Sequence, residues 1–89
     1  MNFLHYDVWT QPGDLVHVTL SGNAANVLLM SESNFQNYRY GKPFQYYGGY
    51  FTRSPAIIKS PSSGHWKVVV DLAGRAGRLS AQVRVVPGL

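Results

Sequence analysis

Three segments of this chain alternate apolar and other side chains with a period of two. They are Asp14–Ser21, His65–Leu72 and Arg78–Val86. Successive side chains of a β-strand point to opposite faces, so each segment predicts a strand with one apolar face. We expect the apolar faces to be buried together between two sheets, with Val16, Val18, Leu20, Val68, Val70, Val83 and Val85 as their side chains.

Three further segments predict strands. Asn2–Trp9 would place Leu4, Tyr6 and Val8 on one face. Ala25–Met30 is almost wholly apolar, which is typical of a central strand. Ala56–Lys59 lies between two prolines, which restrict it to a sheet edge or a strand end. We expect both tryptophans of the chain, Trp9 and Trp66, to belong to the core.

One segment has helical signals instead. Ser33 and Gln36 have the spacing of a capping box, and Gly41 stands where a left-handed helix end belongs. We therefore expect one short helix over Asn34–Tyr40. The residues expected to turn inward, because they are three positions apart, are Phe35 and Tyr38.

The length and composition agree with one small domain. The chain has 89 residues, of which 45% are hydrophobic and 13% charged. We expect a single domain over residues 1–89 with an ordered core of about 2–86. Cysteine is absent, which excludes disulfides, thiolate chemistry and cysteine zinc sites. The fold class predicted from these patterns is all-β, a compact antiparallel β-sandwich or jelly-roll-like barrel with one short helix.

The charges are divided unevenly along the chain. Residues 1–38 hold three acidic residues and no lysine or arginine, whereas residues 39–89 hold all eight basic residues and one acidic residue. Such a distribution favours an anionic partner, although a basic solvated surface that promotes solubility explains it as well. The first nine residues have no lysine or arginine and include Asp7, unlike a secretory signal peptide, and no apolar run could span a bilayer. We expect a bacterial-type cytoplasmic protein.

The candidate binding segment is aromatic and basic. Seven of the twelve aromatic residues lie between Tyr38 and Phe51, with three basic residues among or beside them. Gly48 and Gly49 could form a two-residue hairpin turn that presents Tyr47 and Tyr50 side by side. Rings stack on flat ligands and cations bind phosphates or carboxylates, but rings also cap the open end of a small sandwich. The ligand-binding candidates are Arg39, Tyr46, Tyr47, Tyr50 and Arg53.

Motifs for catalysis are missing from the sequence. We find no nucleophile elbow, no dinucleotide fingerprint and no phosphate loop. His5 and His17 would share a metal site if they lay on neighbouring strands, and His65 with Asp7 or Asp71 could add ligands, but none has the spacing of a common ligand motif. We therefore assign no catalytic residue, no metal ligand and no cofactor. A metal-dependent enzyme that uses these histidines is the least favoured alternative.

Several stretches together resemble a small bacterial family, the domain of unknown function 1883. They are "GDLVHVTLSGNAANVLLM", "SNFQNY", "YYGG", "RSP" and "SSGHWKVVVDL". The resemblance covers almost the whole chain and implies a compact, mostly β domain. Family members occur alone or beside Toll/interleukin-1-receptor-type signalling domains, which implies a sensing or adaptor role. The strand after "GD" and the final "VVVD" strand are also similar to jelly-roll domains of the pre-peptidase and Golgi-dynamics type.

The function predicted from the sequence is a non-catalytic binding or sensing module with a polar or anionic ligand. The alternative is a protein–protein interaction domain that docks through a strand edge or through its aromatic end. We expect no membrane contact, and we find no specific nucleic-acid motif. The oligomeric state does not follow from the sequence.

Overall fold

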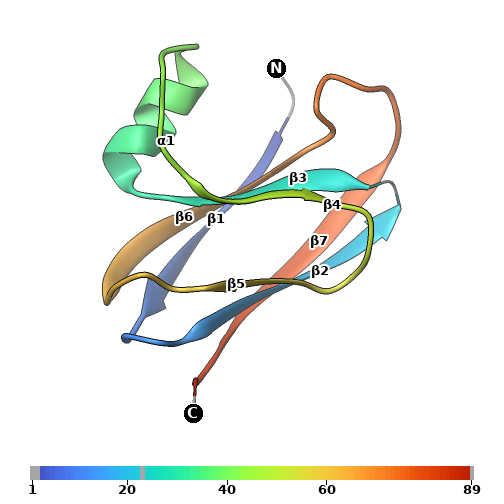
Figure 1. The fold of residues 1–89 in the computed structure, drawn as a ribbon. Coiled ribbons are helices and arrows are strands. Elements are labelled where there is room, and N and C mark those ends of the chain that lie inside the picture. Colours follow the sequence, from blue (N-terminus) through green and yellow to red (C-terminus); the bar gives the residue numbers. More distant parts are fainter. Residues whose placement is uncertain (1–2, 23, 89) are drawn as a thin grey trace.

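Two antiparallel sheets form the body of the domain (Figure 1). The computed structural model describes residues 3–22 and 24–88. The four-stranded sheet has the order β1 (Phe3–Thr10), β6 (Gly64–Asp71), β3 (Ala25–Met30) and β4 (Tyr47–Phe51). The three-stranded sheet has the order β5 (Ala56–Lys59), β2 (Leu15–Gly22) and β7 (Leu79–Val86). The two separate sheets make this a sandwich and confirm the predicted fold class.

The six strands expected from the sequence are confirmed, with bounds that are unchanged or shift by one residue. The near-continuous apolar strand β3 has a hydrogen-bonded neighbour on each side, as predicted, and the proline-flanked β5 is at a sheet edge. Asn2, the expected start of the first strand, lies outside the described residues.

The main core lies between the sheets. Val16 and Val18 of β2 meet Val68 and Val70 of β6, and all four side chains are fully buried. The remaining members of the predicted core set, Leu20, Val83 and Val85, are half-buried against the same cluster. The period-two pattern therefore identified the inner faces of β2, β6 and β7 correctly.

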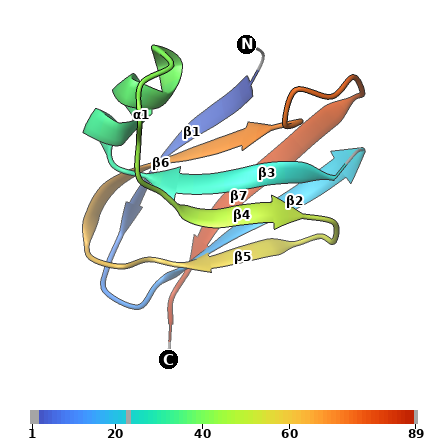
Figure 2. The same cartoon turned by 45° about the horizontal axis from the view of Figure 1, so that its top comes forward.

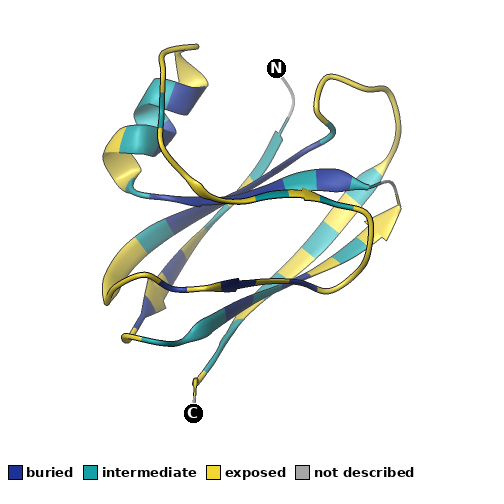
Figure 3. Cartoon of the chain, viewed as in Figure 1, coloured by how far each residue is buried: buried dark blue, intermediate teal, exposed yellow. Residues whose placement is uncertain are grey.

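A second apolar cluster lies on the outer face of the four-stranded sheet, beneath helix α1 (Glu32–Arg39) (Figures 1 and 2). Phe35 and Tyr38 of the helix are buried against Leu28, Met30 and Val69, as the helical spacing predicted. Because β3 and β6 are covered on both faces, they are buried along most of their length (Figure 3). This double cover explains why their sequences are nearly continuous in apolar residues.

The helix begins two residues earlier than expected. Ser31, not Ser33, is the N-cap, because its extended backbone and its Oγ, which accepts the Asn34 N–H at 3.3 Å, match that role. Gln36 donates to Glu32 instead of completing a capping box with Ser33. The predicted left-handed end at Gly41 is confirmed, with φ of 71°. Within the described chain no helix is long and apolar enough to cross a membrane.

Two other expectations were wrong. Gly48 and Gly49 lie inside β4 and form no hairpin turn. A side chain at Gly48, whose φ is 116°, would collide with the backbone oxygen of Val27 on the neighbouring strand, so glycine is required there for close strand approach. Trp66 packs against the core, but Trp9 is 69% exposed, because it lies on the outer face of β1 outside both apolar clusters.

Candidate functional site

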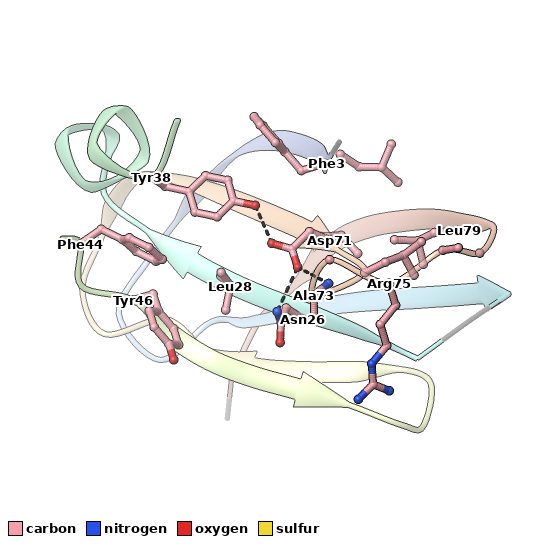
Figure 4. Close-up of a pocket in the computed structure, with 16 residues that line it drawn as sticks. Phe3, Asn26, Leu28, Tyr38, Phe44, Tyr46, Asp71, Ala73, Arg75 and Leu79 are labelled. Carbon is pink, nitrogen blue, oxygen red and sulfur yellow. Dashed lines mark hydrogen bonds between the residues drawn. The ribbon is translucent and has the colours of Figure 1, made fainter. Parts of the chain in front are cut away.

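A pocket of about 930 Å³ opens on the outer face of the four-stranded sheet. It lies between α1 on one side and the β6–β7 loop on the other, and both stand on the same face of the sheet (Figures 1 and 2). Its volume is within the range typical of sites for small organic ligands. The residues that line it come from β1, β3, α1, the α1–β4 segment, β6, the β6–β7 loop and the start of β7 (Figure 4).

Four aromatic rings form one continuous wall of this pocket. Phe3 packs edge-to-face on Tyr38, with ring centroids 5.1 Å apart, and Tyr38 packs in the same way on Phe44 at 5.2 Å. Phe44 is in turn tilted against Tyr46 at 5.6 Å. Because edge-to-face contacts are favourable for aromatic rings, the wall is held in one arrangement.

The ends of helix α1 fix this wall in place. At the carboxyl end, Lys42 donates its backbone N–H to the carbonyl of Asn37 at 2.8 Å, and Gly41 donates to that of Tyr38 at 3.3 Å, which is a Schellman motif. The motif turns the chain back along the helix. Near the amino end, the side-chain oxygen of Asn34 accepts the backbone N–H of Gln45 at 3.0 Å. Phe44 and Tyr46, on either side of Gln45, are thereby directed to the sheet.

Asp71 lies on the floor of the pocket and is 7% exposed. One of its carboxylate oxygens accepts the Asn26 side-chain amide at 2.9 Å and the Ala73 backbone N–H at 2.8 Å, and the other accepts the Tyr38 hydroxyl at 2.5 Å (Figure 4). Burial and this carboxylate raise the pKa of Tyr38 above its ordinary value of 10.0. The carboxylate is therefore satisfied by three donors and joins β3, α1 and the β6–β7 loop.

Arg75 brings a positive charge to the pocket from the β6–β7 loop. A turn positions it, because its backbone N–H donates to the Leu72 carbonyl at 3.0 Å and the two residues between them have positive φ. Its guanidinium donates to the Tyr50 hydroxyl at 3.3 Å and lies 5.7 Å from the centre of that ring. Asp71 and Arg75 are the charged residues among those that line the pocket.

The structure brings only part of the predicted binding set together. Tyr46 lines the pocket and Tyr50 contacts Arg75 at its edge. Tyr47 and Tyr50 were expected side by side, but they project to opposite faces because they are three positions apart in a strand. Tyr47 instead borders a smaller hollow of about 490 Å³ and packs edge-on to Trp66.

The two predicted arginines lie apart from the pocket. Arg39 lies over the rings of Phe35 and Tyr40, 5.8 Å from each ring centre. Arg53 is exposed in the loop after β4 and borders neither hollow. Sequence reasoning missed Arg75, Asp71 and Asn26. The signal available for Asp71 and Arg75 was the five-residue, glycine-rich stretch Ala73–Gly77, which begins one residue after an apolar strand that ends in Asp71.

The histidines do not converge. His5 on β1 and His17 on β2 were considered as neighbours, but their strands belong to different sheets. His65 pairs with Asp7, its Nε2 lying 2.6 Å from the carboxylate. Within residues 3–22 and 24–88, no three side chains of the metal-binding kinds are grouped.

The fold and the pocket define the class: a small β-sandwich domain with one helix-covered face and a ligand-sized pocket at the edge of that cover. The chain belongs to the family described as Domain of unknown function (DUF1883), which matches residues 1–88. This match confirms the family resemblance seen in the sequence. Searches of curated proteins and of solved structures give no match.

Proposed function

We propose that the domain is a non-catalytic binding module for a small, flat organic anion, held in the pocket between α1 and the β6–β7 loop. The observation that carries this proposal is the position of Arg75 at a pocket walled by aromatic rings. The rings offer stacking surface for an apolar body, and the guanidinium offers two-point hydrogen bonding to a carboxylate, sulfonate or phosphate.

The floor of the pocket supports an anionic ligand in spite of the acidic residue there. Asp71 already accepts three hydrogen bonds from protein groups, so it is not free to attract a cation. The same arrangement supports a binding role without catalysis. Asp71 is committed to its three donors, and the raised pKa of Tyr38 disfavours this hydroxyl as a base. The adaptor role, the absence of enzymatic activity and the cytoplasmic location stay predictions.

A pair of fluorescent probes tests this proposal. 1-Anilinonaphthalene-8-sulfonate has flat rings and one anionic group, and N-phenyl-1-naphthylamine has the same rings without the charge. We expect one sulfonate probe to bind per folded chain. Arg75→Gln should weaken its binding about tenfold and leave the neutral probe unchanged, because a hydrogen bond to a charged group is worth about 1.5–3 kcal/mol.

Two further arginine variants make the test specific. Arg84→Gln removes the same charge from an exposed position on β7 that does not border the pocket. This variant should therefore leave the binding of both probes unchanged. Arg53→Gln tests the patch expected from the sequence. Equal losses in Arg53→Gln and Arg75→Gln, or no saturable binding to a chain shown to be folded by circular dichroism, would overturn the proposal.

A further inference from the structure

A second surface feature lies on the same face of the sheet, at the far end of β1 from Phe3. Trp9 is 69% exposed there and belongs to neither apolar cluster. Its partner across the β1–β6 ladder is His65, and the two rings are stacked, with centroids 5.0 Å apart and planes 21° from parallel. Because His65 covers one face of the indole, the opposite face accounts for much of the exposure.

The indole is supported by a chain of polar contacts. His65 Nε2 lies 2.6 Å from one carboxylate oxygen of Asp7, and the Lys67 ammonium donates to the same oxygen at 2.7 Å. Lys67 is itself held between this carboxylate and the Phe35 ring of α1, 4.9 Å away. These two donors hold the pKa of Asp7 below its ordinary value of 3.8, so the carboxylate stays ionised. The platform is therefore fixed without any ligand.

Two hydrogen-bonding groups of these residues remain unused. Among the described residues the Trp9 Nε1–H has no acceptor, and the second carboxylate oxygen of Asp7 has no donor. Both residues lie on the outer face of β1, two positions apart, which separates them by about 7 Å. The open indole face thus has a free donor at its edge, while the free acceptor of Asp7 lies on the side that His65 covers.

We propose that Trp9, His65 and Asp7 form a saccharide-binding platform, distinct from the pocket. The apolar C–H face of a pyranose ring stacks on an open indole, while its hydroxyl groups both donate and accept. The Trp9 Nε1–H would donate to one hydroxyl group, while the Asp7 carboxylate holds His65 against the covered face of the indole. A neutral ligand fits the local charge, because the carboxylates of Asp7 and Glu32 are balanced by Lys67 and by Arg39, which lie over the same Phe35 ring.

The two indole N–H signals in a proton–nitrogen correlation spectrum give a direct test. Trp66 is the internal control, because its Nε1–H already donates to the Ser62 carbonyl at 3.0 Å. The probe is cellotriose, whose equatorial hydroxyl groups leave flat apolar ring faces. We expect cellotriose to move the Trp9 indole signal and the amide signals of β1 and β6 in a saturable way, and to leave the Trp66 indole signal in place.

Variants separate the platform from general surface effects. Trp9→Ala should weaken cellotriose binding, followed by the amide signals, by about tenfold, which corresponds to about 1.4 kcal/mol, because it removes the whole stacking surface. Tyr40→Ala removes another ring that is 69% exposed, and it should leave binding unchanged. Three outcomes would overturn the proposal: no saturable shift with cellotriose, an equal shift of Trp66, or a stronger response of Trp9 to oligothymidylate, which would indicate a nucleic-acid surface.

Discussion

The two faces of the four-stranded sheet are covered in different ways. The inner face meets the second sheet mainly through aliphatic side chains, and Val27, Leu29, Val68 and Val70 are fully buried there. Its aromatic side chains, Tyr6, Phe51 and Trp66, are only partly buried against this core. The outer face is covered by one eight-residue helix, with aromatic rings and two buried charged residues, Lys67 and Asp71, beneath or beside it.

Because of this difference, the inner face contributes mainly to stability and the outer face offers surface for binding. A sheet covers another sheet along its whole length, whereas one short helix covers only part of the outer face. The uncovered parts are the pocket beside α1 at one end and Trp9 at the other. Both proposed sites therefore lie on the face that is incompletely covered, and the polar side chains needed for recognition are held there by hydrogen bonds.

The largest effect expected is on the inner face. Leu29→Ala leaves a cavity between the sheets and should lower the free energy of unfolding by about 2–5 kcal/mol. Leu28→Ala makes the same change on the outer face, next to the pocket, and should cost less, about 2 kcal/mol, because the neighbouring space is already open. Denaturant unfolding of both variants measures the difference. Equal losses would mean that the two faces contribute alike.

A smaller loss is expected for Tyr38→Phe. The substitution removes the hydroxyl that donates to the buried Asp71 carboxylate, which should lower the free energy of unfolding by about 1–3 kcal/mol. The pKa of Tyr38 is raised in the folded state, so its contribution is complete below the unfolded value of about 10 and is lost as the pH rises above it. The difference in the free energy of unfolding between the wild type and Tyr38→Phe should therefore become smaller above pH 10. A difference that does not change with pH would contradict the hydrogen bond from Tyr38 to Asp71.

The helix start gives a matched pair with a still smaller effect. Ser31→Ala removes the N-cap acceptor and should destabilise by about 0.5–2 kcal/mol. Ser33→Ala changes an exposed residue inside the helix and should stay within about 0.5 kcal/mol of the wild type. Thermal unfolding of the two variants compares their stabilities directly. A larger loss of stability in Ser33→Ala than in Ser31→Ala would identify Ser33 as the N-cap, as expected from the sequence.

The smallest effect concerns the exposed network at Trp9. The pKa of Asp7 is lowered in the folded state by Lys67 and His65, so Asp7 stabilises the fold at pH values above its ordinary value of 3.8. This contribution is lost as the pH falls toward the folded pKa. Asp7→Asn should thus melt slightly below the wild type at pH 6, and the difference should disappear well below pH 3.8. A difference that persists in acid would indicate a packing role for Asp7.

The strands could be predicted because apolar and polar side chains alternate along them, which indicates that one face of each strand is buried. The same logic failed for β4, where the sequence Tyr47–Gly48–Gly49–Tyr50 has the composition of a turn and the demand for glycine comes from the neighbouring Val27 backbone. It also failed for Trp9. A tryptophan in a strand is expected in the core because its ring is large and apolar. Trp9 is exposed because α1 does not cover its end of the sheet.

The sequence predicted the kind of candidate site but only some of the residues that form it. An aromatic wall with a cation was expected, and Tyr46 and Tyr50 are in or beside it. The cation that completes it, Arg75, is 25 residues further along the chain than the Tyr50 hydroxyl it contacts. Such pairings depend on how β6 lies against β3, and no local pattern in the sequence records that register.

The strand order also constrains when this domain can form. Phe3 at the beginning of β1 pairs with Asp71 at the end of β6, and Leu15 of β2 pairs with Val86 at the end of β7. Neither of the first two strands forms a ladder with its neighbour in sequence. A chain emerging from the ribosome therefore cannot complete the four-stranded sheet until β6 has been released, or the three-stranded sheet until β7 has been released. Folding rates fall as such contacts become more distant in sequence, so we expect folding over milliseconds to seconds after synthesis. During that interval the apolar strands β3 and β6 are exposed to solvent, and a chaperone could bind to them.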